Sequence, residues 1–190
     1  MFVTCLRWFC RTVDLLVKYA GYFASALMPL LAAIVAFEVF SRYFLNRPTV
    51  WAFDFSLFLF GYIAIIGGAF AQQKGGHITV DILYKKVSVN TRRIFDIITF
   101  SVAIFFLVLI VYICFDKAQD AIKFGTRRQS EWAPPMLHFW IMTISACSLF
   151  ILQLCRDILE NLFVLITGNP LLERQRINIG SKKSETNDGN

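Results

Sequence analysis

Motifs for catalysis and nucleotide binding are absent from this chain of 190 residues. Its sequence contains no glycine-rich phosphate loop, no His-Glu-x-x-His zinc motif and no Gly-x-Ser-x-Gly nucleophile turn. With two histidines and no Cys-x-x-Cys pair, it has no side chains at the usual spacing of metal or redox ligands. We therefore expect a protein that is not an enzyme, with no catalytic residues, cofactor or bound metal.

Charge is scarce as well. Charged residues make up 17% of the chain, whereas 57% of the residues are hydrophobic and 20 are phenylalanine. This composition excludes an ordinary soluble domain and is typical of an integral membrane protein. The five cysteines are interpreted as small apolar side chains rather than redox groups.

Four long apolar segments are present instead. Residues 19–37 contain 19 residues without a charge; at 1.5 Å per residue they span about 28 Å, close to the ~30 Å hydrocarbon core of a bilayer. Similar segments cover residues 55–71, 97–115 and 132–155. The sequence predicts an all-α integral membrane domain over residues 19–167. Its four transmembrane helices should cover about 19–41, 54–73, 94–115 and 134–156, with the last continuing as a helix to 167.

The distribution of basic residues predicts the orientation of these helices. Segments 1–18, 72–96 and 156–190 together carry 13 Lys and Arg, whereas loops 38–54 and 116–131 carry 6. Cytoplasmic segments of membrane proteins are the more basic ones, so both termini should be cytoplasmic. The net charge of +6 then indicates contact with anionic membrane lipids rather than with nucleic acid.

Two shorter helices are expected on the cytoplasmic surface. Residues 1–18 have a helical stripe of apolar side chains, which predicts an amphipathic interfacial helix or, as an alternative, a helix packed on a partner's loops. A second interfacial helix should lie between spans 2 and 3. It follows a turn that contains Gly75, Gly76, His77 and Asp81. The polar segment 168–190 is predicted to be a disordered cytoplasmic tail.

Two residues of the first span each allow a structural and a functional interpretation. Pro29 is interpreted as an ordinary helix kink rather than as the break of a substrate site. Glu38 should lie at the hydrocarbon edge, where Arg42 one turn later can pair with it. A role of Glu38 as a proton carrier is the alternative.

Small residues form a stripe along the second span. They are Gly61, Ala64, Gly67, Gly68 and Ala71. Such a stripe lets another helix approach closely, so we predict helix packing rather than ligand binding here.

The predicted spans 2 to 4 contain no charged residue in their central parts. A protein that moved ions or acids by itself would need polar groups near the middle of the membrane. This deficit favours a helper subunit over a self-sufficient carrier.

Four short motifs around the spans resemble the small membrane subunit, DctQ-like, of tripartite ATP-independent periplasmic (TRAP) transporters. They are Arg42-Tyr43, Trp51 with Asp54, Gly75-Gly76-His77-Ile78-x-Val80-Asp81, and Glu131-Trp132-x-Pro134-Pro135. The similarity covers roughly residues 12–166. This chain departs from the family at Phe53 and Leu57, where relatives often have an acidic residue and an arginine.

The resemblance implies a subunit of the bacterial inner membrane with two protein partners. A large membrane transport subunit, DctM-like, would hold the substrate and sodium sites, and a periplasmic substrate-binding protein would deliver a small organic acid. The candidate contacts to these partners are Glu38, Arg42, Arg47, Trp51, Asp54, Glu131 and Trp132. The alternatives are an autonomous four-span proton-coupled exporter that uses Glu38 and a membrane assembly factor.

Overall fold

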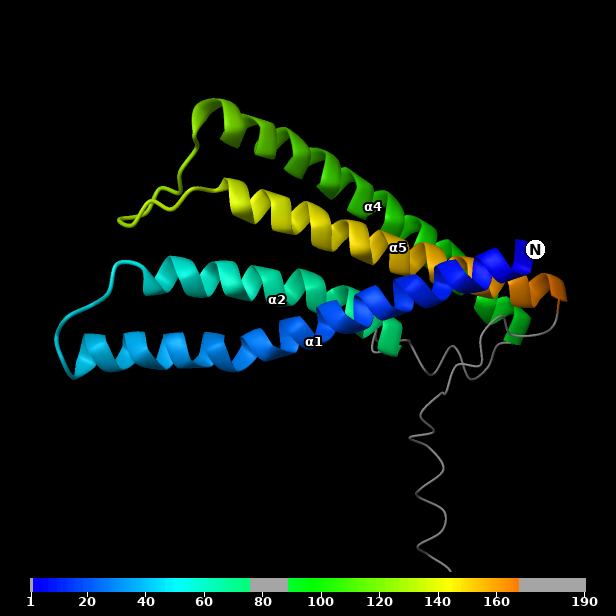
Figure 1. Ribbon diagram of the computed structural model, residues 1–190, viewed down its shortest axis with the longest axis horizontal. Helices are drawn as coiled ribbons and strands as arrows, with labels where there is room; N and C mark the ends of the chain where they lie inside the picture. The colour runs from blue at the N-terminus through cyan, green and yellow to red at the C-terminus, as the bar shows by residue number, and fades with distance from the viewer. Residues whose placement is uncertain (1, 76–88, 168–190) are drawn as a thin grey trace, which may run out of the picture.

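The computed structural model describes residues 2–75 and 89–167, and this part of the chain forms four α-helices (Figure 1). They are α1 (Phe2–Tyr43), α2 (Ala52–Lys74), α4 (Val89–Phe124) and α5 (Leu137–Thr167). All four are long and apolar enough to cross a membrane. For the described residues, the predicted all-α fold with four helices able to span a membrane is confirmed.

The helices form two hairpins, α1 with α2 and α4 with α5, that diverge toward the loops 44–51 and 125–136 (Figure 1). At the opposite end the hairpins converge, and the N-terminus lies beside the end of α5. Helix α5 is central because it packs against α4, α2 and α1, whereas α4 packs chiefly against α5. The two ends of the described chain therefore lie on one side of the bundle.

The helices differ in length, so that α2 ends before the other three helices at one end of the bundle. Helix α2 has 23 residues, or about 35 Å, which suits a bilayer. Helices α1, α4 and α5 have 42, 36 and 31 residues, or about 63, 54 and 46 Å. All three run past the end of α2 at Lys74 on the same side (Figure 1).

Helix α1 is continuous through Lys18, although the sequence predicts a separate surface helix up to this residue and a span after it. Val13 and Val17 are buried and pack with Ala69 of α2 and, at the edge of the cluster, Phe150 of α5. This packing stabilises one continuous helix, because the apolar stripe of the N-terminal segment packs against α2 and α5. The position of residues 1–18 on a membrane surface stays a prediction.

Glycines end two of the helices. Gly75 follows α2 with a φ of 70°, and its amide donates to carbonyl groups of the last turn. Gly125 follows α4 with a φ of 59°. Both positions need the left-handed conformation that glycine adopts at low cost.

Helix α5 begins at Leu137, three residues later than the predicted start at residue 134. The two prolines before it belong to the loop instead. The Pro134 carbonyl accepts a hydrogen bond from the Arg128 amide at 3.0 Å, and the Met136 amide donates to Thr126 at 3.2 Å. These bonds hold the backbone in a paired turn, so it enters the helix only after Pro135.

The small-residue stripe of α2 is used in part. A Cβ atom at Gly61 would lie 3.2 Å from Phe139, and one at Gly68 would lie 3.3 Å from Phe150, so both glycines face rings of α5. Ala71 is half-buried, whereas Ala64 is exposed and Gly67 has nothing near it within 4 Å among the described residues.

Among the described glycines, the closest contact lies between α1 and α2, at a glycine outside that stripe. A Cβ atom at Gly21 would lie 2.3 Å from the ring of Phe70. Gly76, His77, Asp81, the predicted second interfacial helix and the predicted disordered tail lie outside the described residues.

Candidate functional site

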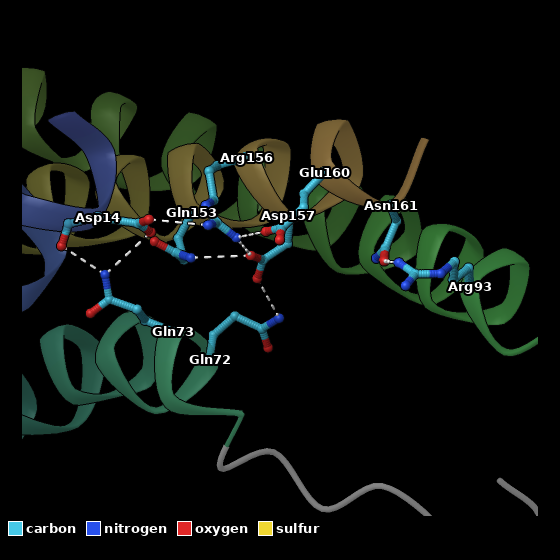
Figure 2. Close-up of polar contacts among 9 residues, drawn as sticks. All are labelled: Asp14, Gln72, Gln73, Arg93, Gln153, Arg156, Asp157, Glu160 and Asn161. Atoms are coloured by element: carbon cyan, nitrogen blue, oxygen red, sulfur yellow. Dashed lines mark hydrogen bonds and ion pairs between the residues drawn. The ribbon is translucent and has the colours of Figure 1, made fainter. Parts of the chain in front are cut away.

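The sequence of α5 places four polar side chains at the edge where α2 ends. Gln153, Arg156, Asp157 and Glu160 follow one another at steps of three, one and three residues, so they share one face of the helix. Figure 2 shows that this face is directed at Asp14 of α1 and at the last turn of α2. We call Asp14, Gln72, Gln73 and these four residues the polar cluster.

Arg156 is the centre of the polar cluster, and its side chain is 2% exposed. One terminal nitrogen lies 3.1 Å from a carboxylate oxygen of Asp14, and the other lies 2.9 Å from Asp157 and also contacts Glu160. A buried guanidinium is stable only when its charge is paired and its donors are bonded. Three carboxylates pair the charge of Arg156 here, while its Nε atom is buried and has no hydrogen-bond partner among the described residues.

Amide side chains connect the last turn of α2 to the same cluster (Figure 2). Gln72 donates to Asp157 at 3.0 Å, and Gln73 donates to the backbone carbonyl of Asp14 at 2.7 Å. Gln153, which is fully buried, donates to Asp157 at 3.3 Å. The polar cluster therefore joins α1, α2 and α5 by directional bonds that fix their register.

The charges of the polar cluster do not cancel. Asp14, Asp157 and Glu160 supply three negative charges and Arg156 one positive charge, so the four groups carry a formal charge of −2 when all are ionised. The cluster lies at the last turn of α2, and the other three helices continue beyond this turn. This location suits a membrane edge, where charged groups cost less than at the centre of the bilayer.

A second set of ionic contacts lies at the diverging end. Asp54 in the first turn of α2 is 1% exposed and lies 2.8 Å from the guanidinium of Arg128, which belongs to the loop before α5. The Ser130 hydroxyl also donates to Asp54. This contact fastens one hairpin to the loop of the other. Asp54 is thus buried and bonded inside its own chain, and its role as a partner contact stays a prediction.

Glu38 near the end of α1 forms hydrogen bonds to the loop between α1 and α2. Its carboxylate accepts a hydrogen bond from Arg42 at 2.6 Å, which confirms the predicted pair, and another from the Thr49 amide at 3.1 Å. The Thr49 hydroxyl donates to the same carboxylate. With both oxygens bonded to loop and helix groups, the geometry favours a structural role for Glu38.

The other candidate contacts of the sequence analysis lie on the exposed surface of this end. Arg42, Arg47, Trp51, Glu131 and Trp132 are all exposed. Arg42 lies in the last turn of α1, and the other four lie in the two loops. Their role as partner contacts stays a prediction.

The polar cluster is the feature that the sequence reasoning missed. Asp14 belongs to the segment 1–18, for which the sequence predicts an interfacial helix, and Arg156 is the last residue of the predicted span 134–156. The available signal was the spacing of Gln153, Arg156, Asp157 and Glu160, which puts four polar groups on one face of an otherwise apolar helix. No local pattern indicates that Asp14 is their partner.

Comparison with known proteins identifies the family. The model of the family described as "Tripartite ATP-independent periplasmic transporters, DctQ component" matches residues 31–164. The chain belongs to this family. The DctQ component is a membrane subunit of a transporter, so the expectation that the chain is not an enzyme is confirmed, and so is the resemblance noted in the sequence.

Two relatives from Vibrio cholerae show partial similarity to the chain. The C4-dicarboxylate TRAP transporter small permease protein DctQ is 21% identical over 104 residues, which cover 55% of this chain and 45% of the relative. The sialic acid TRAP transporter small permease protein SiaQ is 27% identical over 66 residues, which cover 35% of this chain and 38% of the relative. The chain thus matches less than half the length of each relative. No solved structure matches the chain.

Proposed function

We propose that the chain is the small membrane subunit of a sodium-driven TRAP transporter that imports a small organic acid into a bacterial cell. In this proposal a large transport subunit moves the substrate, and a periplasmic substrate-binding protein delivers it. The relatives are named for a C4-dicarboxylate and for sialic acid, both of which are carboxylic acids. That shared chemistry and the family membership support the substrate class.

The observation that carries the proposal is the distribution of charge along the bundle. In the described residues, charged side chains gather at the two ends, around Arg156 and around Asp54 and Glu38. Between these ends the described helices carry no charged side chain that could bind an ionic substrate. Transport must then depend on another polypeptide.

The same contacts suit a rigid support. The polar cluster fixes α1, α2 and α5 at one end, and the Asp54–Arg128 contact ties the hairpins together at the other. Helix α4 exposes a long apolar surface, including Phe105, Phe106 and Tyr112, that lipid or the large subunit would cover. We infer that the small subunit anchors the large subunit in the bilayer.

The orientation follows from the basic residues. The two ends of the described chain lie together at one end of the bundle, beside the polar cluster. The positive-inside rule places this end on the cytoplasmic side of the inner membrane. The loops 44–51 and 125–136 then face the periplasm, where the substrate-binding protein would dock.

Purification and reconstitution test this proposal. The tagged chain should co-purify with a much larger membrane protein, and liposomes should take up an organic acid in a sodium gradient only when both proteins and the receptor are present. Uptake by liposomes that contain this chain alone would contradict the proposal.

Charge reversals test the docking role of the periplasmic loops. Arg47→Glu and Glu131→Lys change exposed side chains and should weaken receptor binding to the reconstituted complex. Arg11→Glu, an exposed change at the opposite end, is the matched control and should have no effect. Receptor binding that is equal in all three variants would exclude these loops from docking.

A further inference from the structure

Two lysines near the end of α2 lie over a pair of aromatic rings. The Lys18 ammonium lies 5.9 Å from the centre of the Tyr22 ring, and the Lys74 ammonium lies 5.5 Å from the centre of the Phe70 ring. The centres of the two rings are 6.0 Å apart. These are the distances of cation–π contacts, so each ammonium group is held against a ring. We call these four residues the lysine–ring cluster.

Close packing of α1 on α2 brings the lysine–ring cluster together. Phe70 lies beside Gly21, where an added Cβ atom would be 2.3 Å from the ring. Tyr22 follows Gly21 directly in α1. Lys18 and Lys74 are each one helical turn from the ring that they contact. Because α1 and α2 run in opposite directions (Figure 1), both lysines lie on the same side of the ring pair, toward the end of α2.

The charges of the two lysines are not neutralised within the described part of the chain. Lys18 and Lys74 are exposed, and no carboxylate among the described residues forms an ion pair with either. The polar cluster lies at the same end of the bundle, but its carboxylate on α1, Asp14, is directed at Arg156 of α5 (Figure 2). The lysine–ring cluster therefore offers two positive charges to a ligand outside the described chain.

The lysine–ring cluster also has an order of depth. Lys74 is the last residue of α2, and the length of this helix, about 35 Å, suits a bilayer. The lysines then lie at the membrane surface, whereas Tyr22 and Phe70 lie one turn, or about 6 Å, further into the bilayer. Tyr22 is 53% exposed, so a lipid molecule can reach its ring.

We propose that the lysine–ring cluster binds an anionic phospholipid of the adjoining leaflet. The lipid phosphate would accept hydrogen bonds from the ammonium groups of Lys18 and Lys74, and the glycerol and first acyl carbons would lie deeper, against Tyr22. An ammonium group has three N–H donors, so contact with a ring leaves donors for the phosphate. An anionic headgroup fits better than a zwitterionic one, because the latter brings its own cation next to the two lysines.

The inference requires that the bundle crosses a membrane with the end of α2 at one surface. It does not depend on transport or on a partner protein, so its failure and the failure of the proposed function are separate results.

Native mass spectrometry of the full-length chain in detergent tests the proposal, because it counts the lipid molecules that are bound. The chain is titrated with phosphatidylglycerol or with phosphatidylcholine of the same acyl chains. We expect the first phosphatidylglycerol to bind with about 25-fold higher affinity, since each of two basic residues contributes about fivefold toward an anionic lipid. Equal affinity for the two lipids overturns the proposal.

Lys18→Gln and Lys74→Gln should each lower this preference about fivefold. Lys18→Arg keeps the charge and should preserve the preference. Arg11→Gln is the matched control, because Arg11 is an exposed cation of α1 two turns before Lys18 and outside the lysine–ring cluster. A preference that persists in K18Q and K74Q overturns the proposal, and so does an equal loss in R11Q, which would indicate a diffuse surface attraction.

Tyr22→Leu removes the ring that the Lys18 ammonium contacts and keeps an apolar side chain at this position. It should lower the affinity for phosphatidylglycerol about threefold, the effect of one exposed cation–π contact that no longer holds the ammonium in place. Tyr112→Leu changes an exposed tyrosine of α4 and should have no effect. An unchanged affinity in Y22L overturns the proposal, because the lysines would then act without the rings.

Discussion

Arg156 of α5 donates a hydrogen bond to Asp14 of α1 across 3.1 Å, although the two residues are 142 positions apart in the chain. The contact joins the first helix to the last, and Gln72 and Gln73 join α2 to the same groups. A chain whose helix surfaces are mostly apolar has few directional contacts to set how its helices slide against each other. The polar cluster supplies them at one end.

Loss of Arg156 should destabilise the bundle. Arg156→Met leaves three carboxylates close together without a cation, and removing one member of a buried ion pair costs about 3–5 kcal/mol. Thermal unfolding in detergent, followed by a thiol-reactive dye at the buried Cys10, Cys114 and Cys147, measures this change. Arg11→Met at the exposed surface of α1 is the control and should shift stability by less than about 0.5 kcal/mol. Equal unfolding curves would show that Arg156 contributes no net stability.

The Asp54–Arg128 contact should show energetic coupling. Asp54→Asn and Arg128→Gln each break it, and a double-mutant cycle should give a coupling of about 1–2 kcal/mol. The value is below that for a fully buried pair because the Arg128 side chain is 28% exposed and can be hydrated when its partner is lost. Glu131→Gln in the same loop should leave stability unchanged. Additive effects of D54N and R128Q would mean that the hairpins are held together by apolar packing alone.

Gly21 should tolerate no side chain. In Gly21→Ala the added Cβ atom would lie 2.3 Å from the ring of Phe70 and 2.8 Å from its Cβ atom, so either α1 or α2 must shift. Overpacking of this kind costs about 1–3 kcal/mol. Gly67→Ala adds the same atom where nothing lies within 4 Å, and this control should be neutral or slightly stabilising. Comparable losses of stability in the two variants would show that contact with Phe70 is not responsible.

Glu38→Gln separates the scaffold from the exporter interpretation. We expect no transport by the chain alone in liposomes, with or without the substitution, and continued substrate uptake by the complete transporter. The reason is that Glu38 bonds to Arg42 and Thr49 at the end of α1, and glutamine keeps an acceptor there. Transport by the unmodified chain that disappears in E38Q would instead identify Glu38 as a proton carrier.

Much of the fold could be predicted from local sequence. The four spans follow from the length of the apolar segments, and the ends of α2 and α4 follow from Gly75 and Gly125, which adopt left-handed backbone conformations. The pairing of Glu38 with Arg42 is also local, because one helical turn separates them. The start of α5 was missed by three residues because bonds between distant loop residues hold Pro134 and Pro135 outside the helix.

The sequence by itself predicted four segments long and apolar enough to cross a membrane, with no charged residue in the central parts of spans 2 to 4. Composition and helical period act over a few residues, so they can be read along the chain. Only the tertiary structure decided that Asp14 pairs with Arg156, that Asp54 is buried against Arg128, and that α1 continues past Lys18. Those outcomes depend on which helix faces meet, and side chains of the same type and spacing would be solvated if their helices packed differently.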